Sequence, residues 1–122
     1  MKYVYIAGPY RGRTHDYQSY CEIDANINQA RLAAAALAEA GIGFFAPHLH
    51  SAHFEVIAPH ATPEFWYELD MRFLEMCDAI LLLPRWSESR GAKAELDWAR
   101  AHGMDVLYSI AEAIEWATAP VL

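Results

Sequence analysis

Short apolar runs alternate with longer helical segments along the whole chain. The β-rich runs cover residues 2–7, 43–46, 78–83 and 104–108. They are too short for stable helices and are rich in aliphatic and aromatic residues, which is typical of strands. The run 78–83 is apolar without interruption, as expected for a strand that is buried on both faces. The pattern therefore predicts four to five strands separated by helices.

The helices are marked by signals at their ends. The alanine-rich segment 22–40 precedes a glycine, which is a common C-terminal stop. A helix over 62–76 begins with Thr-Pro-Glu, which supplies a cap, a first-turn proline and a first-turn acid. A third helix is predicted from Ser89 to about residue 103. Ser109, followed three residues later by a glutamate, matches the capping box of a last short helix.

The alternating order of strands and helices predicts a flavodoxin- or Rossmann-like three-layer α/β sandwich. Helices then cover both faces of a parallel sheet. If the strand order is 2-1-3-4, the order reverses between the first and third strands, where ligands bind in such folds. Segments 8–13 and 84–91 meet at that point. The polar segment 11–20 and the histidine-bearing segment 48–61 are expected to be loops.

Composition narrows the class of protein. The 122 residues contain no repeat or linker, which predicts a single domain over 1–122. No apolar run reaches the roughly 20 residues of a membrane span, and the amino terminus lacks a secretory signal, so we expect a cytoplasmic location and no membrane partner. Cys21 and Cys77 form no CxxC pair and are expected to be free, partly buried thiols. The net charge of −7 argues against a nucleic acid polymer as partner.

The glycine in the helix after residue 89 is the first candidate for a functional role. Glycine in a helix interior costs about 1 kcal/mol relative to alanine. Gly91 and Glu95 are four residues apart and share a face, so a missing side chain leaves space over the Glu95 carboxylate. Ser89 lies at the helix start, where free N–H groups favour an anion. The alternative is a solvated helix with an ordinary cap. We expect Glu95 at the edge of the buried face, whose members are Ala92, Leu96, Ala99 and Gly103.

Asp70 is the second candidate, because it falls among apolar positions of the helix 62–76. Trp66 and Leu74 lie one turn from it on either side. Burial against apolar surface raises the pKa of a carboxyl, which suits an acid or a donor to a leaving group. The alternative is that Asp70 faces solvent at the edge of the apolar stripe.

Histidines are concentrated in the segment after the second predicted strand. His48, His50 and His53 are spaced so that they could converge on zinc. No cysteine or acidic residue completes a familiar ligand spacing, so we expect no metal. We expect a polar loop that covers the ligand, with one histidine touching it.

Three motifs together resemble one known family. They are Y-I-A-G-P-Y-R-G at 5–12, Asp70 followed by L-x-x-C-D-A-I at 74–80, and S-x-G-x-x-x-E at 89–95. They resemble the nucleoside 2-deoxyribosyltransferase-like superfamily, which includes the 2'-deoxynucleoside 5'-monophosphate N-glycosidases. The resemblance implies one domain of that type, acting on a small-molecule nucleoside or nucleotide without cofactor. It also implies a homodimer or higher homo-oligomer.

The resemblance also assigns roles by position. Glu95 resembles the nucleophile, Asp70 the acid that assists the base and sugar, and Ser89 and Gly91 the seat of the 5' group. The segment around His48 is not one that the family pattern matches, and it is expected to set base or sugar preference. The residues of the first loop that resemble substrate contacts are Gly8, Tyr10 and Arg11.

These roles describe cleavage or transfer at an N-glycosidic bond. Glu95 is expected to be ionised near neutral pH, because an unperturbed glutamate has a pKa of about 4.3. It attacks the anomeric carbon while Asp70 assists the departing base, and water or a second base resolves the glycosyl-enzyme. The alternative is a non-catalytic nucleotide-binding module in which Glu95 holds ribose hydroxyls.

Overall fold

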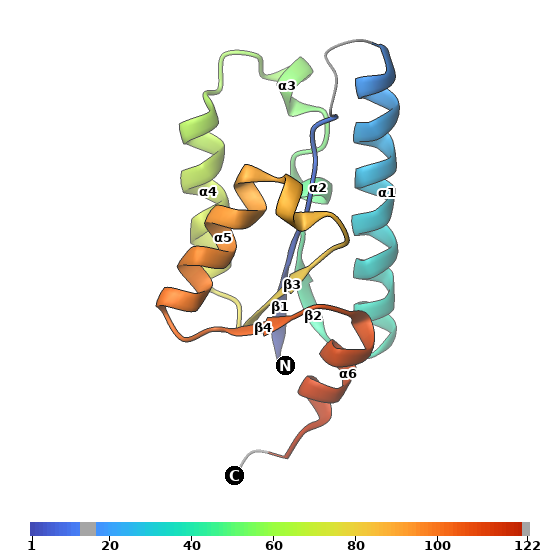
Figure 1. The fold of residues 1–122 in the computed structure, drawn as a ribbon, viewed down its shortest axis with the longest axis vertical. Coiled ribbons are helices and arrows are strands. Elements are labelled where there is room, and N and C mark those ends of the chain that lie inside the picture. The colour runs from blue at the N-terminus through green and yellow to red at the C-terminus, as the bar shows by residue number, and fades with distance from the viewer. Residues whose placement is uncertain (13–16, 121–122) are drawn as a thin grey trace.

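The sheet has four parallel strands in the order β2-β1-β3-β4, which confirms the predicted order (Figure 1). The computed structural model describes residues 1–12 and 17–120. The all-parallel arrangement follows from the helix that separates each pair of consecutive strands. The strands are β1 (Tyr3–Ala7), β2 (Gly43–Phe45), β3 (Ala79–Leu82) and β4 (Asp105–Leu107).

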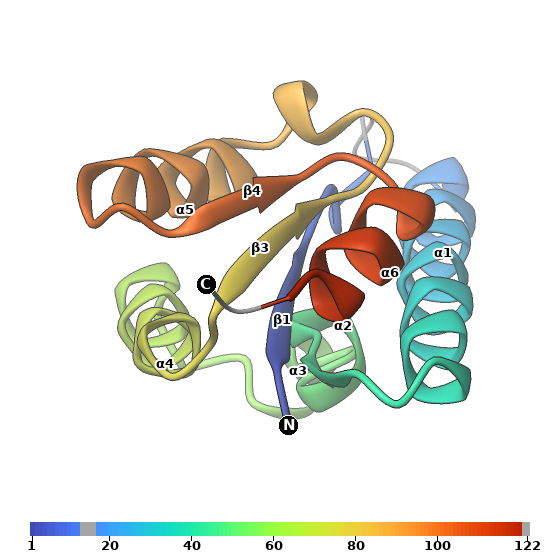
Figure 2. The ribbon, with the colours of Figure 1, turned by 90° about the horizontal axis from the view of Figure 1, so that it is seen from below.

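Helices cover both faces of this sheet, as the α/β sandwich requires (Figure 2). On one face lie α1 (Tyr17–Glu39) and α6 (Ile110–Thr118), which contact each other. On the opposite face lie α4 (Pro63–Glu75) and α5 (Arg90–Ala101). This arrangement is the predicted flavodoxin- or Rossmann-like three-layer fold.

The end signals of the helices act as predicted. In each of three helices a hydroxyl oxygen accepts a hydrogen bond from the backbone N–H three residues on, which satisfies a donor that the helix leaves free. These hydroxyls belong to Thr62 for α4, Ser89 for α5 and Ser109 for α6. Gly41 follows α1 with φ of 74°, a conformation that glycine adopts without strain.

The expected loops contain more helix than the sequence indicated. The segment 48–61 holds two single-turn helices, α2 (Pro47–His50) and α3 (Phe54–Ile57). A 3-10 turn, η1 (Trp86–Glu88), follows β3. The helix α1 begins at Tyr17, before the predicted residue 22. Single-turn helices carry too few residues for a periodic pattern, so sequence alone does not reveal them.

Two other expectations concern the cysteines and the membrane. Cys77 is half-buried and Cys21 is exposed, and both are free thiols. The expectation of partial burial is therefore wrong for Cys21, because this position of α1 faces away from the sheet. Within the described ranges no helix is both long enough and apolar enough to cross a bilayer.

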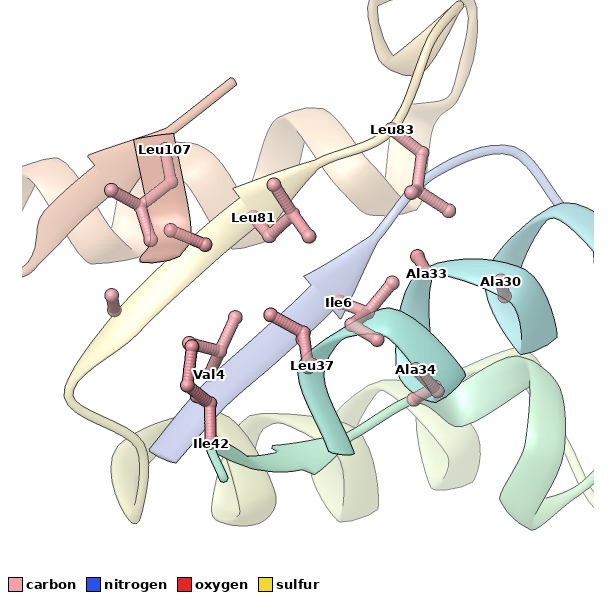
Figure 3. Close-up of a cluster of buried hydrophobic side chains, with 13 residues drawn as sticks. Val4, Ile6, Ala30, Ala33, Ala34, Leu37, Ile42, Leu81, Leu83 and Leu107 are labelled. Atoms are coloured by element: carbon pink, nitrogen blue, oxygen red, sulfur yellow. The ribbon is translucent and has the colours of Figure 1, made fainter. Parts of the chain in front are cut away.

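The core is divided by the sheet, and β1 contributes to both halves. Val4 and Ile6 point toward α1 and α6, into a cluster whose buried members are all aliphatic (Figure 3). Tyr5 and Ala7 alternate with them and point toward α4 and α5. Successive side chains of a strand face opposite sides, so one short strand anchors both halves.

Candidate active site

A cavity of about 840 Å³ lies beyond the carboxyl ends of β1 and β3. The backbone N–H of Leu83 donates to the carbonyl of Ala7 at 2.8 Å, so the segments that follow the two strands start side by side. These segments, with α2, α3 and α4, form the walls. All the residues that the sequence nominated for catalysis or substrate binding line this cavity: Gly8, Tyr10, Arg11, His48, Asp70, Ser89, Gly91 and Glu95.

The predicted space beside Gly91 is present. A Cβ atom built on Gly91 would lie 3.9 Å from the Ser89 Oγ, which is an ordinary van der Waals distance. Apart from the backbone of α5 and the two neighbouring residues, no other atom of the described residues lies within 4 Å of that position. Ser89 itself is occupied as the cap of α5, accepting from the backbone N–H of Ala92 at 3.1 Å. Gly91 therefore leaves open space on the cavity side of α5, one turn from Glu95.

Glu95 is buried, although the sequence placed it at the edge of the buried face. Its side chain is only 9% exposed, and the Tyr5 hydroxyl donates a hydrogen bond to its Oε2. Tyr5 comes from β1 and is fully buried beneath the cavity. Burial also raises the pKa of Tyr5, with a further contribution from the Glu95 charge, so its hydroxyl stays protonated and remains a donor.

Burial raises the pKa of Glu95 to about 8. The hydrogen bond from Tyr5 acts in the opposite direction, and the nearby Asp70 carboxylate adds to the rise. The expectation that Glu95 is ionised near neutral pH is therefore wrong. It failed because the sequence does not reveal how deeply a position on the edge of a helix face is buried.

Asp70 has the desolvated environment that the sequence predicted. Burial raises its pKa to about 6. Its Oδ1 is buried and has no hydrogen-bond partner within the described part of the chain. These two pKa values predict that Asp70 and Glu95 together hold one proton between about pH 6 and pH 8, and the higher pKa of Glu95 favours that carboxyl as its place. Two carboxyls with separated pKa values are a common arrangement for acid and base roles.

The loop that follows β1, which is called the first loop here, is held in place by contacts with Leu83 and His48. A Cβ on Gly8 would lie 2.8 Å from the Cβ of Leu83, so close packing requires glycine there. The Nε2 of His48 lies 2.9 Å from the Pro9 carbonyl, which can only accept, so Nε2 carries the hydrogen. Burial lowers the pKa of His48 and favours the neutral ring. His48 thus supports the loop, and its contact with substrate stays a prediction.

The outer rim of the cavity is a polar network around Tyr10. The Tyr10 hydroxyl donates to Glu55 at 2.8 Å and accepts from the backbone N–H of His53 at 2.7 Å. Burial raises the pKa of Tyr10 to about 12, so the hydroxyl stays a donor. The Nδ2 of Asn26 donates to the Tyr10 carbonyl at 3.0 Å, and the Oδ1 of Asn26 accepts from Arg85 at 2.8 Å. This network joins the loop after β1, α1, α3 and the segment after β3.

Sequence reasoning missed Tyr5, Glu55 and Arg85. A signal for Tyr5 existed, because a tyrosine in a strand that is buried on both faces needs a partner for its hydroxyl. No comparable signal existed for Glu55, which lies on the single-turn helix α3. Arg85 adopts a left-handed conformation with φ of 65°, which sequence does not indicate for an arginine.

The three histidines that were candidate zinc ligands have separate partners. His48 contacts the Pro9 carbonyl, and the Nε2 of His53 lies 3.2 Å from the Oδ1 of Asp24. His50 packs against two phenylalanine rings, with centroids 5.4 Å apart in each case. Across residues 1–12 and 17–120, no three His, Cys, Asp or Glu side chains are grouped so that they could hold a metal ion.

Comparison with known proteins adds a family and a fold relative. Residues 2–108 match the family model described as Domain of unknown function (DUF4406). No curated protein matches the chain. Among solved structures, a 2-deoxyribosyltransferase from the psychrotolerant bacterium Bacillus psychrosaccharolyticus has a similar fold, with a TM-score of 0.55 and 17% sequence identity. The alignment covers 85% of this chain and 69% of that one. At this identity the likeness establishes a shared fold.

Proposed function

We propose that this chain, which belongs to the family Domain of unknown function (DUF4406), cleaves or transfers at the N-glycosidic bond of a small nucleoside. The substrate is a (deoxy)nucleoside or its 5'-monophosphate. The observation that carries the proposal is the buried Glu95, held by Tyr5 one turn from the open space at Gly91. Asp70 lines the same cavity, and the similarly folded solved structure is that of a 2-deoxyribosyltransferase.

Glu95 is the nucleophile of the proposed reaction and Asp70 is the acid. A carboxylate oxygen of Glu95 forms a bond to the anomeric carbon while the bond from that carbon to the base nitrogen breaks. The electron pair of the broken bond stays with the base, which takes a proton from Asp70. Water or a second base then attacks the same carbon and releases Glu95, and Asp70 receives the proton of the attacking group. The two-carboxylate scheme of retaining glycosidases has this logic.

The proton of the carboxyl pair has to change place for this reaction. At neutral pH it resides mainly on Glu95, whereas the reaction needs it on Asp70. The Tyr5 hydrogen bond favours the ionised form of Glu95. Positive charge that develops on the sugar also favours that form, because an opposite charge nearby stabilises a carboxylate. The number of protons in the pair is unchanged, so the shift needs no net uptake of a proton from solvent.

The remaining predicted residues are proposed to hold the substrate. Ser89 and Gly91 flank the start of α5, where unpaired backbone N–H groups suit a 5'-hydroxyl or 5'-phosphate. Gly91 leaves room for the sugar. The other proposed substrate contacts lie in the loop after β1 and on α2, and they line the cavity: Gly8, Tyr10, Arg11 and His48.

We also propose that the chain forms a homodimer or a larger homo-oligomer. Phe65 and Tyr67 on α4 are each 50% exposed, and Ile57 on α3 is 71% exposed. Tyr67 lines the cavity as well, so a second copy that covers this surface would lie against its rim. Light scattering on the purified chain tests this, and a monomer at all concentrations contradicts it.

The test of the reaction is release of free base. A panel of nucleosides and their 5'-monophosphates is incubated with the wild-type chain and with Glu95→Gln, and free base is measured by chromatography. We expect release by the wild type and a loss of at least about a thousandfold in the variant. Glu115→Gln on α6, which is exposed, is the matched control and should keep full activity. Wild-type rates in Glu95→Gln would contradict the assignment of the nucleophile.

A second candidate function is a non-catalytic nucleotide-binding module. The raised pKa of Glu95 favours it, because a protonated glutamate is a hydrogen-bonding group for ribose hydroxyls and a poor nucleophile. Calorimetry separates the two functions. Tight nucleotide binding without any release of base would favour the module.

A further inference from the structure

We propose that Glu55 selects the base by accepting a hydrogen bond from an exocyclic amino group. The chain would then prefer nucleosides of adenine and cytosine to those of hypoxanthine and uracil. This inference rests on the proposed function and deepens it by naming the class of substrate. It follows from three features: the cavity has two chemically different sides, Tyr10 holds the Glu55 carboxylate in place, and that carboxylate keeps acceptor positions free for a ligand.

The cavity has two chemically different sides. The start of α5 supplies Gly91 and the buried Glu95, which is where a sugar fits. The side formed by α3 and α4 is aromatic: Phe54 and Trp66 line it and pack edge to face, with centroids 5.7 Å apart and planes at 87°. Flat bases pack well against aromatic rings. Asp70, the proposed acid for the base, follows Trp66 by one turn on α4, so the base belongs on this side.

Glu55 lies next to Phe54 on α3 and, like Phe54, lines the cavity. The Tyr10 hydroxyl lies 2.8 Å from Oε2 and 3.1 Å from Oε1. Because the backbone N–H of His53 donates to the Tyr10 oxygen at 2.7 Å, the Tyr10 hydrogen is available for Glu55. The carboxylate is therefore fixed by a donor that comes from the first loop.

Glu55 keeps acceptor capacity after these contacts. An ionised carboxylate has about four lone-pair sites, and Tyr10 fills one with its single hydrogen. The Nδ1 of His53 also lies 3.9 Å from Oε1 of Glu55, but the Nε2 of the same ring is closer to Asp24, at 3.2 Å. The Glu55 side chain is 24% exposed, so it is partly withdrawn from water. A partly buried carboxylate with free acceptor positions accepts a hydrogen bond from a donor group of a ligand, and it disfavours an acceptor group of a ligand at the same place.

The chemistry of the bases turns this into a preference. Adenine and cytosine carry an amino group where hypoxanthine and uracil carry a carbonyl. The amino group donates to Glu55, whereas a carbonyl oxygen would face the carboxylate and leave it unpaired. Hydrogen bonds to charged groups and the loss of such pairs commonly change rates by roughly tenfold to a hundredfold.

The experiment measures kcat/KM for two matched substrate pairs, deoxyadenosine with deoxyinosine and deoxycytidine with deoxyuridine. We expect the wild type to favour the amino member of each pair by about tenfold or more. In Glu55→Gln the ratio should fall toward one or reverse, because the amide can donate to a carbonyl. The change in ratio between the two chains is the readout, since the bases differ in their own leaving ability. Glu64→Gln, at the exposed start of α4 and outside the cavity, is the control and should leave the ratio unchanged.

Tyr10→Phe gives an independent test of how Glu55 is held. Loss of the hydroxyl removes the donor that fixes the carboxylate. The preference for amino bases should then decrease, while the ratio of ribosyl to deoxyribosyl substrates stays as in the wild type. A change in the sugar ratio with an unchanged base ratio, in either variant, would mean that Glu55 contacts a sugar hydroxyl and would overturn the inference.

Binding measurements distinguish failure of this inference from failure of the proposed function. Calorimetry is run with the same four nucleosides on the wild type and on Glu55→Gln. Base release with a ratio that Glu55→Gln does not alter leaves the function standing and overturns the role of Glu55. Absence of release, with amino-selective binding that is lost in Glu55→Gln, rejects the function and supports Glu55. Absence of both release and binding overturns both.

Discussion

The two faces of the sheet bury their side chains in different ways, although the same strands build both. Toward α1 and α6 the buried cluster is entirely aliphatic, with Val4 and Ile6 from β1 at its centre. Toward α4 and α5 the alternate residue Tyr5 is hydrogen-bonded to the buried Glu95. One residue along β1 thus separates a dry core from the floor of the candidate active site.

The difference concerns free energy as well as chemistry. Burial of aliphatic surface stabilises the fold by about 25 cal/mol per Å², and the buried cluster on the α1–α6 face is built from aliphatic side chains. On the α4–α5 face, burial withdraws two carboxyls from water and raises the pKa of each. Such groups destabilise a fold unless they are protonated or paired. The aliphatic face therefore offsets what the candidate site costs, and substitutions on the two faces should have opposite effects.

The largest effect on stability is expected on the aliphatic face. Leu37 of α1 is fully buried there, and Leu37→Ala should lower the free energy of unfolding by about 2–5 kcal/mol, because it leaves a cavity in a tightly packed cluster. Urea denaturation measures this change. The rate of base release per folded molecule should stay within about twofold of the wild type. A loss of turnover in the fully folded variant would show that the two faces are not independent.

Glu95→Gln should raise stability, in contrast to Leu37→Ala. The folded pKa of Glu95, about 8, lies above the unfolded value of about 4.3. Below pH 4 the carboxyl is protonated in both states and contributes no difference. Between about pH 4.3 and pH 8 the unfolded chain releases the proton while the folded chain retains it, so folded stability falls as pH rises. Gln removes this loss, which is on the order of a few kcal/mol at pH 8.

Thermal unfolding at several pH values measures the effect. The melting temperature of Glu95→Gln should match the wild type near pH 4 and exceed it by several degrees near pH 8. Glu115→Gln on α6 serves as the exposed control and should leave the curve unchanged. A gap between Glu95→Gln and the wild type that does not vary with pH would mean that burial of the carboxyl is not its cause.

Tyr5→Phe should change the pH dependence of the reaction. With carboxyl pKa values of about 6 and 8, kcat/KM should follow a bell whose maximum is near pH 7. The Tyr5 hydrogen bond lowers the pKa of Glu95, so its loss moves the alkaline limb above 8. It also lowers the rate at pH 7 by about tenfold for each pKa unit. Tyr3→Phe, on the same strand but half exposed, should leave both unchanged, and an unaltered profile in Tyr5→Phe would exclude this role of the hydroxyl.

The contrast between the two faces of the sheet also explains which features of the fold and of the candidate site could be predicted from the sequence. The strand order and the place of Gly91 and Glu95 at the switch point could be predicted, because period, capping and parallel topology are local or follow from general rules. The place of Asp70 in the same cavity was implied by the family resemblance. The deep burial of Glu95 could not be predicted, because it depends on how β1 and α4 pack against α5. Tyr5 was missed because a strand buried on both faces shows no alternation of apolar and polar residues.

Glu55 shows a different limit. Its place in the cavity depends on the single-turn helix α3 and on the contact with Tyr10, 45 residues earlier in the chain. Neither leaves a periodic signal. Site residues on long regular elements are therefore predictable from one sequence, whereas those on short irregular segments become visible only when the fold brings them to the cavity.

Gly91→Ala has the smallest expected effect on stability and tests the site most directly. Alanine favours the helix over glycine by about 0.5–1 kcal/mol, and the new methyl would make only an ordinary contact with the Ser89 Oγ, at 3.9 Å. Stability should therefore rise slightly, while KM increases severalfold because the methyl occupies the space proposed for the sugar. Gly91→Val should raise KM further without the gain in stability, since β-branched residues are weaker helix formers. If Gly91→Ala gains stability and its KM is unchanged, the sugar does not lie over α5, and the Glu95 carboxylate is not placed to reach it.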